Sequence, residues 1–102
     1  MATMKNPTTK KKLPRVIIRT TSAGVHYGHL VSRKGKEVQL TQSRRIWYWH
    51  GAASLSQLAT EGCDNQSKIG VPIDVILTEA IEIITCTGKG AAVMEGMQPW
   101  RA

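Results

Sequence analysis

The sequence predicts a mainly β (α+β) protein: a small bent antiparallel sheet or a partly open barrel with one short helix and a basic N-terminal arm. The chain has 102 residues, the length of one domain, and could bury a core without disulfides or metals. Alternating β-branched segments joined by short turns dominate it, and clear helical periodicity occurs only once. The spacing of Gly28-His29-Leu30 and Val38-Gln39-Leu40 fits the second and third strands of an SH3-like or Sm-like barrel.

The first 14 residues predict a flexible basic arm. The segments Asn6-Pro7-Thr8-Thr9 and Leu13-Pro14 show no periodicity that could bury a face. We therefore expect the arm over residues 1–14, one β-rich domain over residues 15–98, and a tail over residues 99–102. Pro99 and Trp100 in the tail predict a hydrophobic clasp.

Three strands are expected in the first half of the domain. Residues 15–20 are β-branched with flanking charges, and residues 24–33 alternate large side chains with small ones. Glycines at 24 and 28 indicate a bend or the close approach of another backbone. The turn residues Lys34-Gly35-Lys36 then predict a hairpin with a third strand over residues 37–50.

The second half begins with the expected helix. Residues 52–60 have helical period, Ser54 and Gln57 are spaced as a capping box, and Gly62 is a natural stop. A polar loop is expected over residues 63–72. Residues 73–85 return to strand chemistry, interrupted near Thr78-Glu79.

Gly88-Lys89-Gly90 is expected to separate this strand region from a weak helix over residues 91–97.

The segment from Arg44 to His50 concentrates aromatic rings and positive charge, with two of the three tryptophans of the chain. Alternate side chains of a strand point to opposite faces. One face would carry Arg45, Trp47 and Trp49. The other would carry Arg44, Ile46 and Tyr48. In a strand without a bulge this second face is in phase with Val38 and Leu40, which predicts that it is the core side.

The face with Trp47 and Trp49 would then need a cover. A helix, a second subunit, or a ligand that stacks on the rings and pairs with Arg45 could supply it. Packing of these rings in a core or subunit interface is the alternative to a ligand-binding surface.

Positive charge is concentrated in the front half of the chain. The net charge is +7, the first 20 residues contain six cations and no acid, and residues from 51 onward are mildly acidic. Such a distribution suits a polyanionic partner or head-to-tail contact between copies. The candidate anion-binding residues are Lys10, Lys11, Lys12, Arg33, Lys34, Lys36, Arg44 and Arg45. With Trp47, Tyr48 and Trp49 as stacking or interface residues, they combine charge for phosphates with rings for bases.

Neither catalysis nor a metal or cofactor is expected. His26 and His29 are three residues apart on a strand, so their rings should point to opposite faces, and neither cysteine completes a zinc set. The segment Thr87-Gly88-Lys89-Gly90 lacks the spacing of a phosphate loop, and no serine or cysteine lies in a nucleophile-elbow context.

The location is expected to be cytoplasmic. Cys63 and Cys86 are too far apart for a redox pair, which predicts free thiols in a reducing compartment. No segment has the apolar length of a membrane helix or of a signal-peptide core.

The chain resembles an uncharacterised family of small phage and prophage proteins that carry a domain of unknown function. The most specific similarities are Trp47-Tyr48-Trp49 and the run Gly51-Ala52-Ala53-Ser54-Leu55-Ser56-Gln57-Leu58-Ala59. The similarity covers about residues 15 to 85. It implies a phage origin and no known enzymatic activity, and it supplies no catalytic residues.

The leading functional hypothesis is a non-enzymatic phage or prophage accessory protein that self-associates and binds nucleic acid or a nucleotide. One alternative is an inhibitor of a host defence system that binds a host protein or a nucleotide signal. Another is a virion structural component, in which neighbouring subunits would order the arm.

Overall fold

The computed structural model describes residues 13–101, and the predicted anion-binding residues Lys10, Lys11 and Lys12 lie outside this range. The described chain is mainly β. Its strands are β3 (Arg15–Thr20), β4 (Val25–Lys34), β5 (Glu37–Tyr48), β6 (Lys68–Ile69), β7 (Ile73–Leu77) and β8 (Ala80–Thr85). Its helices are α1 (Leu55–Glu61) and α2 (Gly88–Glu95).

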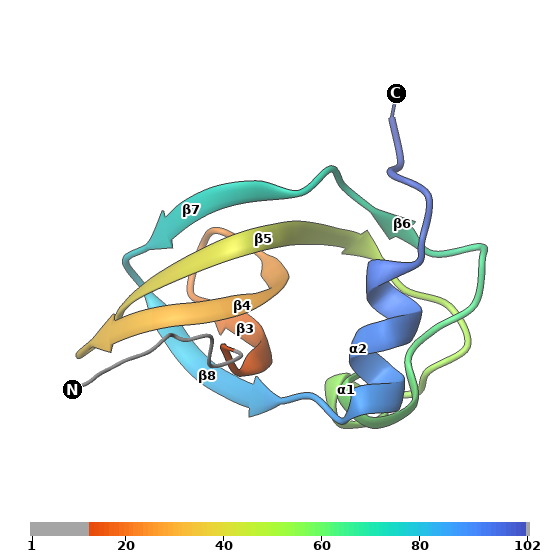
Figure 1. Ribbon diagram of the computed structural model, residues 1–102, viewed down its shortest axis with the longest axis horizontal. Coiled ribbons are helices and arrows are strands. Elements are labelled where there is room, and N and C mark those ends of the chain that lie inside the picture. The colour runs from red at the N-terminus through yellow and green to blue at the C-terminus, as the bar shows by residue number, and fades with distance from the viewer. Residues whose placement is uncertain (1–12, 102) are drawn as a thin grey trace, which may run out of the picture.

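All strand pairs are antiparallel and form one sheet in the order β6-β5-β4-β3-β8, while β7 pairs with the first half of β5. The sheet curls so that β7 and β8 approach each other, and the two helices lie side by side at one end (Figure 1). Within residues 13–101, β7 and β8 form no ladder with each other, so the barrel does not close. The bent antiparallel sheet is therefore confirmed as an open one.

Two parts of the second half differ from the prediction. Residues 68–69, expected in a polar loop, form β6 because Ile69 is fully buried and pairs with Ile46. The glycines at 88 and 90, expected to precede a helix, form its first turn because the Thr87 hydroxyl accepts from the Gly90 N–H at 3.0 Å. Residues 13–101 thus contain a second helix, which overlaps the weak helix predicted over residues 91–97 but begins at Gly88.

Both helices depend on local sequence signals. Ser54 caps α1 by accepting from the Gln57 N–H at 3.2 Å, and Gly62 ends the helix with a φ of 84°, as predicted. A Cβ added at Gly90 would lie 2.1 Å from the carbonyl oxygen of Ala59. Glycine at this position therefore allows α2 to touch α1. Neither helix is long and apolar enough to cross a membrane.

Two hydrophobic cores lie on opposite faces of the sheet. The helix-side core consists of Ile17, Tyr27, Ile46, Leu58, Ala59, Ile69, Ala91 and Met94. The curl core, enclosed by the curled sheet, consists of Val16, Ile18, Val38, Leu40, Leu77 and Ala80. Strand β3 contributes to both, because successive side chains alternate between them.

A β-bulge in β5 reverses which side chains face each core. Tyr27 pairs with Arg44 and His29 with Thr41, so β5 has one residue more than β4 in this interval. Gln42 lies there with a φ of 51°. The prediction that Val38 and Leu40 share a face with Ile46 is therefore wrong. The expected close approach of another backbone at Gly28 is confirmed, since an added Cβ would lie 3.3 Å from the main-chain Cα of Ser43.

A second irregularity separates the two tryptophans of the strand. Ile46 pairs with Ile69 and Tyr48 with Lys68, which leaves Trp47 as an extra residue. Trp47 is 58% exposed, whereas Trp49 is half-buried against the helix-side core. The predicted common face of Trp47 and Trp49 and the predicted core position of Tyr48, which is 46% exposed, are both wrong.

Candidate functional site

Trp47 does not stand alone on the surface, because the C-terminal tail brings Trp100 beside it. The two ring centroids are 6.1 Å apart and the ring planes are inclined by 57°. The main-chain N–H of Trp100 donates to the carbonyl oxygen of Ile69 at 2.8 Å, which ties the tail to β6. Sequence reasoning paired Trp47 with Trp49. The Pro99-Trp100 clasp was the signal that could have identified the true partner.

A cation lies over each of these rings. The Arg45 guanidinium carbon is 5.5 Å from the Trp47 ring centroid, and Lys68 Nζ is 5.3 Å from the Trp100 ring centroid. Neither cation forms a salt bridge within residues 13–101. We call these four residues, Arg45, Trp47, Lys68 and Trp100, the Trp47–Trp100 surface. It presents two partly exposed rings flanked by two free positive charges.

A hollow of about 330 Å³ lies next to this surface. The loop between β3 and β4 forms one wall, and Gly24, with a φ of 87°, allows the loop to turn there. Arg45 and Trp47 form the other wall. A group stacked on Trp47 would therefore have room for a substituent beside the ring.

Arg44 does not fit the predicted anion-binding role. Its side chain is 3% exposed and its guanidinium donates to main-chain carbonyls: Nε to Gly70 at 2.7 Å and Nη1 to Met94 at 2.8 Å. The bulge turns Arg44 inward toward the end of α2, where carbonyls of the last helical turn need donors. Arg44 is thus a structural residue, and only its neighbour Arg45 faces outward.

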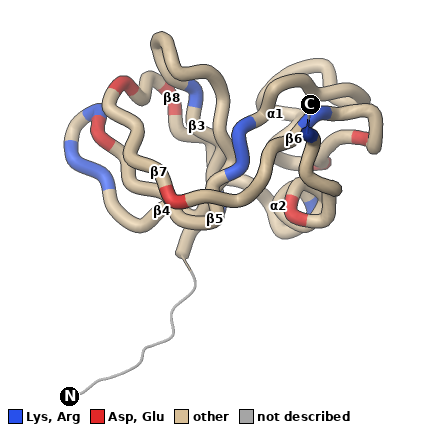
Figure 2. The backbone as a smooth tube through the Cα atoms, turned by 90° about the horizontal axis from the view of Figure 1, so that it is seen from above, with Lys and Arg blue, Asp and Glu red and all other residues tan. Residues whose placement is uncertain are grey.

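The other predicted cations form a separate group. Arg33, Lys34 and Lys36 are exposed at the tip of the β4–β5 hairpin, at the opposite end of the sheet from the helices (Figure 1). Figure 2 shows Lys and Arg at this tip and again near β6 and the C-terminus, with no continuous strip between them. The hairpin-tip cations therefore form a surface separate from Arg45 and Lys68.

Tyr48 and His50 form a further aromatic pair, with centroids 6.4 Å apart. His50 Nδ1 lies 2.6 Å from Asp64 Oδ2, and this hydrogen bond lowers the pKa of the Asp64 carboxyl. Tyr48 is exposed but contributes no ring to the Trp47–Trp100 pair. It is therefore available as a control residue.

A partly exposed polar cluster around Glu95 was not predicted from the sequence. Its carboxylate accepts from the Tyr27 hydroxyl and lies 2.8 Å from His29 Nε2 and 3.3 Å from Arg15 Nε. Burial opposes ionisation of Glu95, but these partners outweigh it and lower its pKa. Burial and the same hydrogen bond raise the pKa of Tyr27 far above its usual value. The cluster ties α2 to β3 and β4.

The histidines and cysteines do not gather. His26 is buried with Nε2 2.8 Å from the Ala23 carbonyl, whereas His29 bonds to Glu95. Cys63 and Cys86 are free thiols, and burial raises the pKa of Cys86 to about 11. In the part of the chain that the structure describes, no group of three or more histidine, cysteine or acidic side chains could hold a metal ion.

The family described as Domain of unknown function (DUF6948) matches residues 13–94. The chain belongs to this family. The matched range contains Arg45, Trp47 and Lys68 and ends before Trp100. No curated protein matches the sequence, and no solved structure matches the fold.

Proposed function

We propose that this DUF6948 protein is a non-enzymatic module that binds single-stranded nucleic acid at the Trp47–Trp100 surface. The observation that carries the proposal is the pairing of two exposed rings with two cations that have no carboxylate partner in residues 13–101. Bases stack on the rings, and Arg45 and Lys68 attract the phosphates between them.

The chemistry of this surface suits single-stranded nucleic acid better than a duplex. Base–aromatic stacking contributes about 1–3 kcal/mol per base and needs unpaired bases with open faces. Two rings 6.1 Å apart can engage neighbouring bases, whereas paired bases keep their faces inside the helix. A free nucleotide could use only one ring together with the hollow beside Trp47.

A phage or prophage accessory role is part of the same proposal. It rests on the resemblance carried by Trp47-Tyr48-Trp49 and the run from Gly51 to Ala59. The hairpin-tip cations and the lysine-rich arm would add a second, less specific attraction for phosphate.

The ring contribution is tested with a fluorescent oligothymidine of about twelve nucleotides and anisotropy measured at low salt. Trp47→Ala and Trp100→Ala should each weaken binding about tenfold, because each removes one stacking platform. Tyr48→Ala is the matched aromatic control and should change the affinity less than about twofold. All three rings are at least partly exposed, so the variants should keep the wild-type circular dichroism spectrum.

The charge contribution is read from the salt dependence of the same titration. Lys68→Ala should flatten the slope of log affinity against log salt by about 0.7, whereas Lys89→Ala, the change of an exposed lysine on α2, should leave it unaltered. The proposal fails if the wild type does not bind at low salt. It also fails if deletion of residues 1–12 abolishes binding while Trp47→Ala and Trp100→Ala have no effect.

A further inference from the structure

Strand β8 has one edge without a partner strand. It pairs with β3 along one side, and no other described strand forms a ladder with it. The Cys86 N–H donates to the Arg15 carbonyl, so by the alternation of an antiparallel ladder the main-chain groups of Ile83 and Thr85 point away from β3. These donors and acceptors are oriented for another strand.

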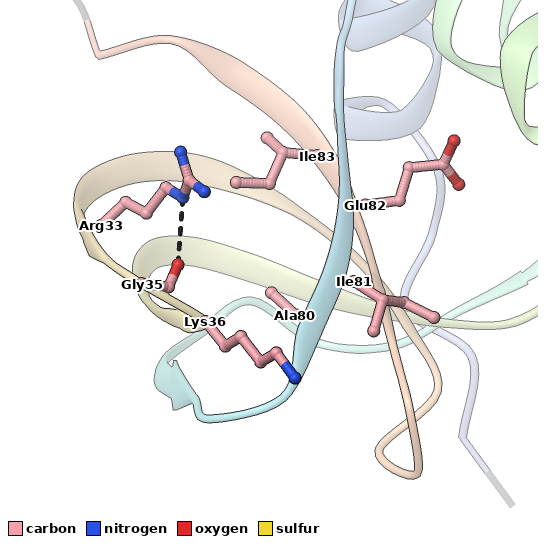
Figure 3. A pocket seen from close by; sticks show the side chains of 7 residues that line it. All are labelled: Arg33, Gly35, Lys36, Ala80, Ile81, Glu82 and Ile83. Atoms are coloured by element: carbon pink, nitrogen blue, oxygen red, sulfur yellow. Dashed lines mark hydrogen bonds between the residues drawn. The ribbon is translucent and has the colours of Figure 1, made fainter.

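A groove of about 410 Å³ runs along this edge, between β8 and the tip of the β4–β5 hairpin. Its lining residues are Arg33, Gly35, Lys36, Ala80, Ile81, Glu82 and Ile83 (Figure 3). The Ala80 N–H donates to the Lys36 carbonyl at 3.1 Å and holds the hairpin tip against the start of β8. The shape of the groove is therefore fixed by a main-chain hydrogen bond, and the edge of β8 forms one of its walls.

The charge at this groove is positive. Arg33 donates from Nε to the Gly35 carbonyl at 3.1 Å, and neither Arg33 nor Lys36 has a salt-bridge partner within residues 13–101. Glu82 lies on the other side of β8 from Arg33 (Figure 3) and is paired with Arg19 at 3.0 Å. An occupant with acidic side chains would therefore meet two free cations.

The edge of β8 lacks the features that usually block strand addition. Proteins protect exposed edges with proline or with charges placed along the strand. Residues 80–85 contain no proline, and their one charged residue, Glu82, forms a salt bridge with Arg19. Ile81 is 48% exposed at the register shift and adds an apolar contact. By contrast, β7 follows Pro72 and carries Asp74.

We propose that this groove docks an extended, acidic peptide segment of a partner protein by adding it as a strand to the edge of β8. Main-chain hydrogen bonds to Ile83 and Thr85 supply the pairing, and Arg33 and Lys36 select acidic side chains. The docking groove and the Trp47–Trp100 surface lie at opposite ends of the sheet, so both could be occupied at once (Figure 1).

The test uses the full chain and a labelled peptide of about eight residues that alternates Glu and Val. Amide chemical-shift mapping should show the largest changes at Ile81, Ile83 and Thr85 and none at Trp47. Lys36→Glu should weaken binding about fivefold. Lys34→Glu, the same change on a neighbouring residue that does not line the groove, should weaken it less than about twofold.

Three outcomes would overturn the proposal. The first is the absence of shifts at a peptide concentration of about 1 mM. The second is equal binding of a peptide that alternates Lys and Val, which would remove the role of Arg33 and Lys36. The third is a change in the same amides that depends on protein concentration alone, because it would identify a second copy of the chain as the occupant. None of these outcomes bears on nucleic-acid binding at the other end of the sheet.

Discussion

The two halves of β5 on either side of Gln42 use the same alternation of side chains to opposite effect. Before Gln42, Val38 and Leu40 point into the curl core. After it, Arg44 and Ile46 point toward the helices and Arg45 faces the other way, until the second irregularity at Trp47. A strand without the extra residue would have placed one set of side chains against one core along its whole length.

This difference separates two adjacent arginines. Arg44 faces the helices and is buried among main-chain carbonyls, whereas Arg45 faces outward over the Trp47 ring. The bulge thus lets one strand fill two cores and still present a cation and a ring to solvent. Bulges often occur where a side chain must be redirected toward a functional surface.

The largest expected effect on the free energy of unfolding comes from replacing one of these two arginines with methionine. Arg44→Met removes the guanidinium donor from the carbonyls of Gly70 and Met94 and should lower the free energy of unfolding by about 3–5 kcal/mol. Arg45→Met removes a half-exposed cation–π contact and should cost only about 0.5 kcal/mol. Urea unfolding of both variants measures the difference. Equal losses would contradict the assignment of Arg44 as structural and Arg45 as surface.

A smaller effect is expected at the bulge itself. Gln42 has a φ of 51°, a conformation that is unfavourable for residues with a Cβ and worst for β-branched ones. Gln42→Gly should therefore raise the free energy of unfolding by about 0.5 kcal/mol, and Gln42→Val should lower it by about 1 kcal/mol. The order Gly, Gln, Val in denaturant midpoints tests this. The reverse order, which β propensity alone would give, would show that position 42 is ordinary strand.

The strands β3, β4 and β5 and helix α1 could be predicted because their signals lie in neighbouring residues. Alternation, the turn at Gly35, and the Ser54 cap all act within a few positions of the chain. The interruption of the strand region near Thr78-Glu79 was predicted for the same reason and separates β7 from β8.

The site could not be predicted in the same way. Arg44 finds its carbonyl partners 26 and 50 residues away, and Trp47 meets a ring from the C-terminal tail. Strand β6 is only two residues long, so its apolar residue gives no periodicity. The two irregularities in β5 were the decisive unknown, because each moves the following side chains to the other face.

The smallest expected effect is a difference in how the stability of the two faces of the sheet depends on pH. His26 pairs with Ile18 and so lies on the face of the curl core. Burial lowers the pKa of His26, with a further contribution from Arg45 and opposition from the Ala23 carbonyl. A base whose pKa is lowered on folding is protonated more readily in the unfolded chain. The stability that His26 contributes is therefore complete above its ordinary pKa of 6.5 and is lost as the pH falls below that value.

Glu95, which bonds Tyr27 of the helix-side core, should respond in a lower range. Its folded pKa lies below the ordinary value of 4.5, so its contribution is present above 4.5 and is lost as the pH falls through the folded pKa. The Glu95 side chain is 36% exposed, so solvent screening keeps its contribution to the free energy of unfolding small.

Free energies of unfolding measured from about pH 7.5 to about pH 3 distinguish the contribution of His26 from that of Glu95. His26→Asn should remove only the loss that begins near pH 6.5, and Glu95→Gln only part of the loss below pH 4.5. A change by either variant in the other range would show that the two faces of the sheet are coupled and do not titrate independently.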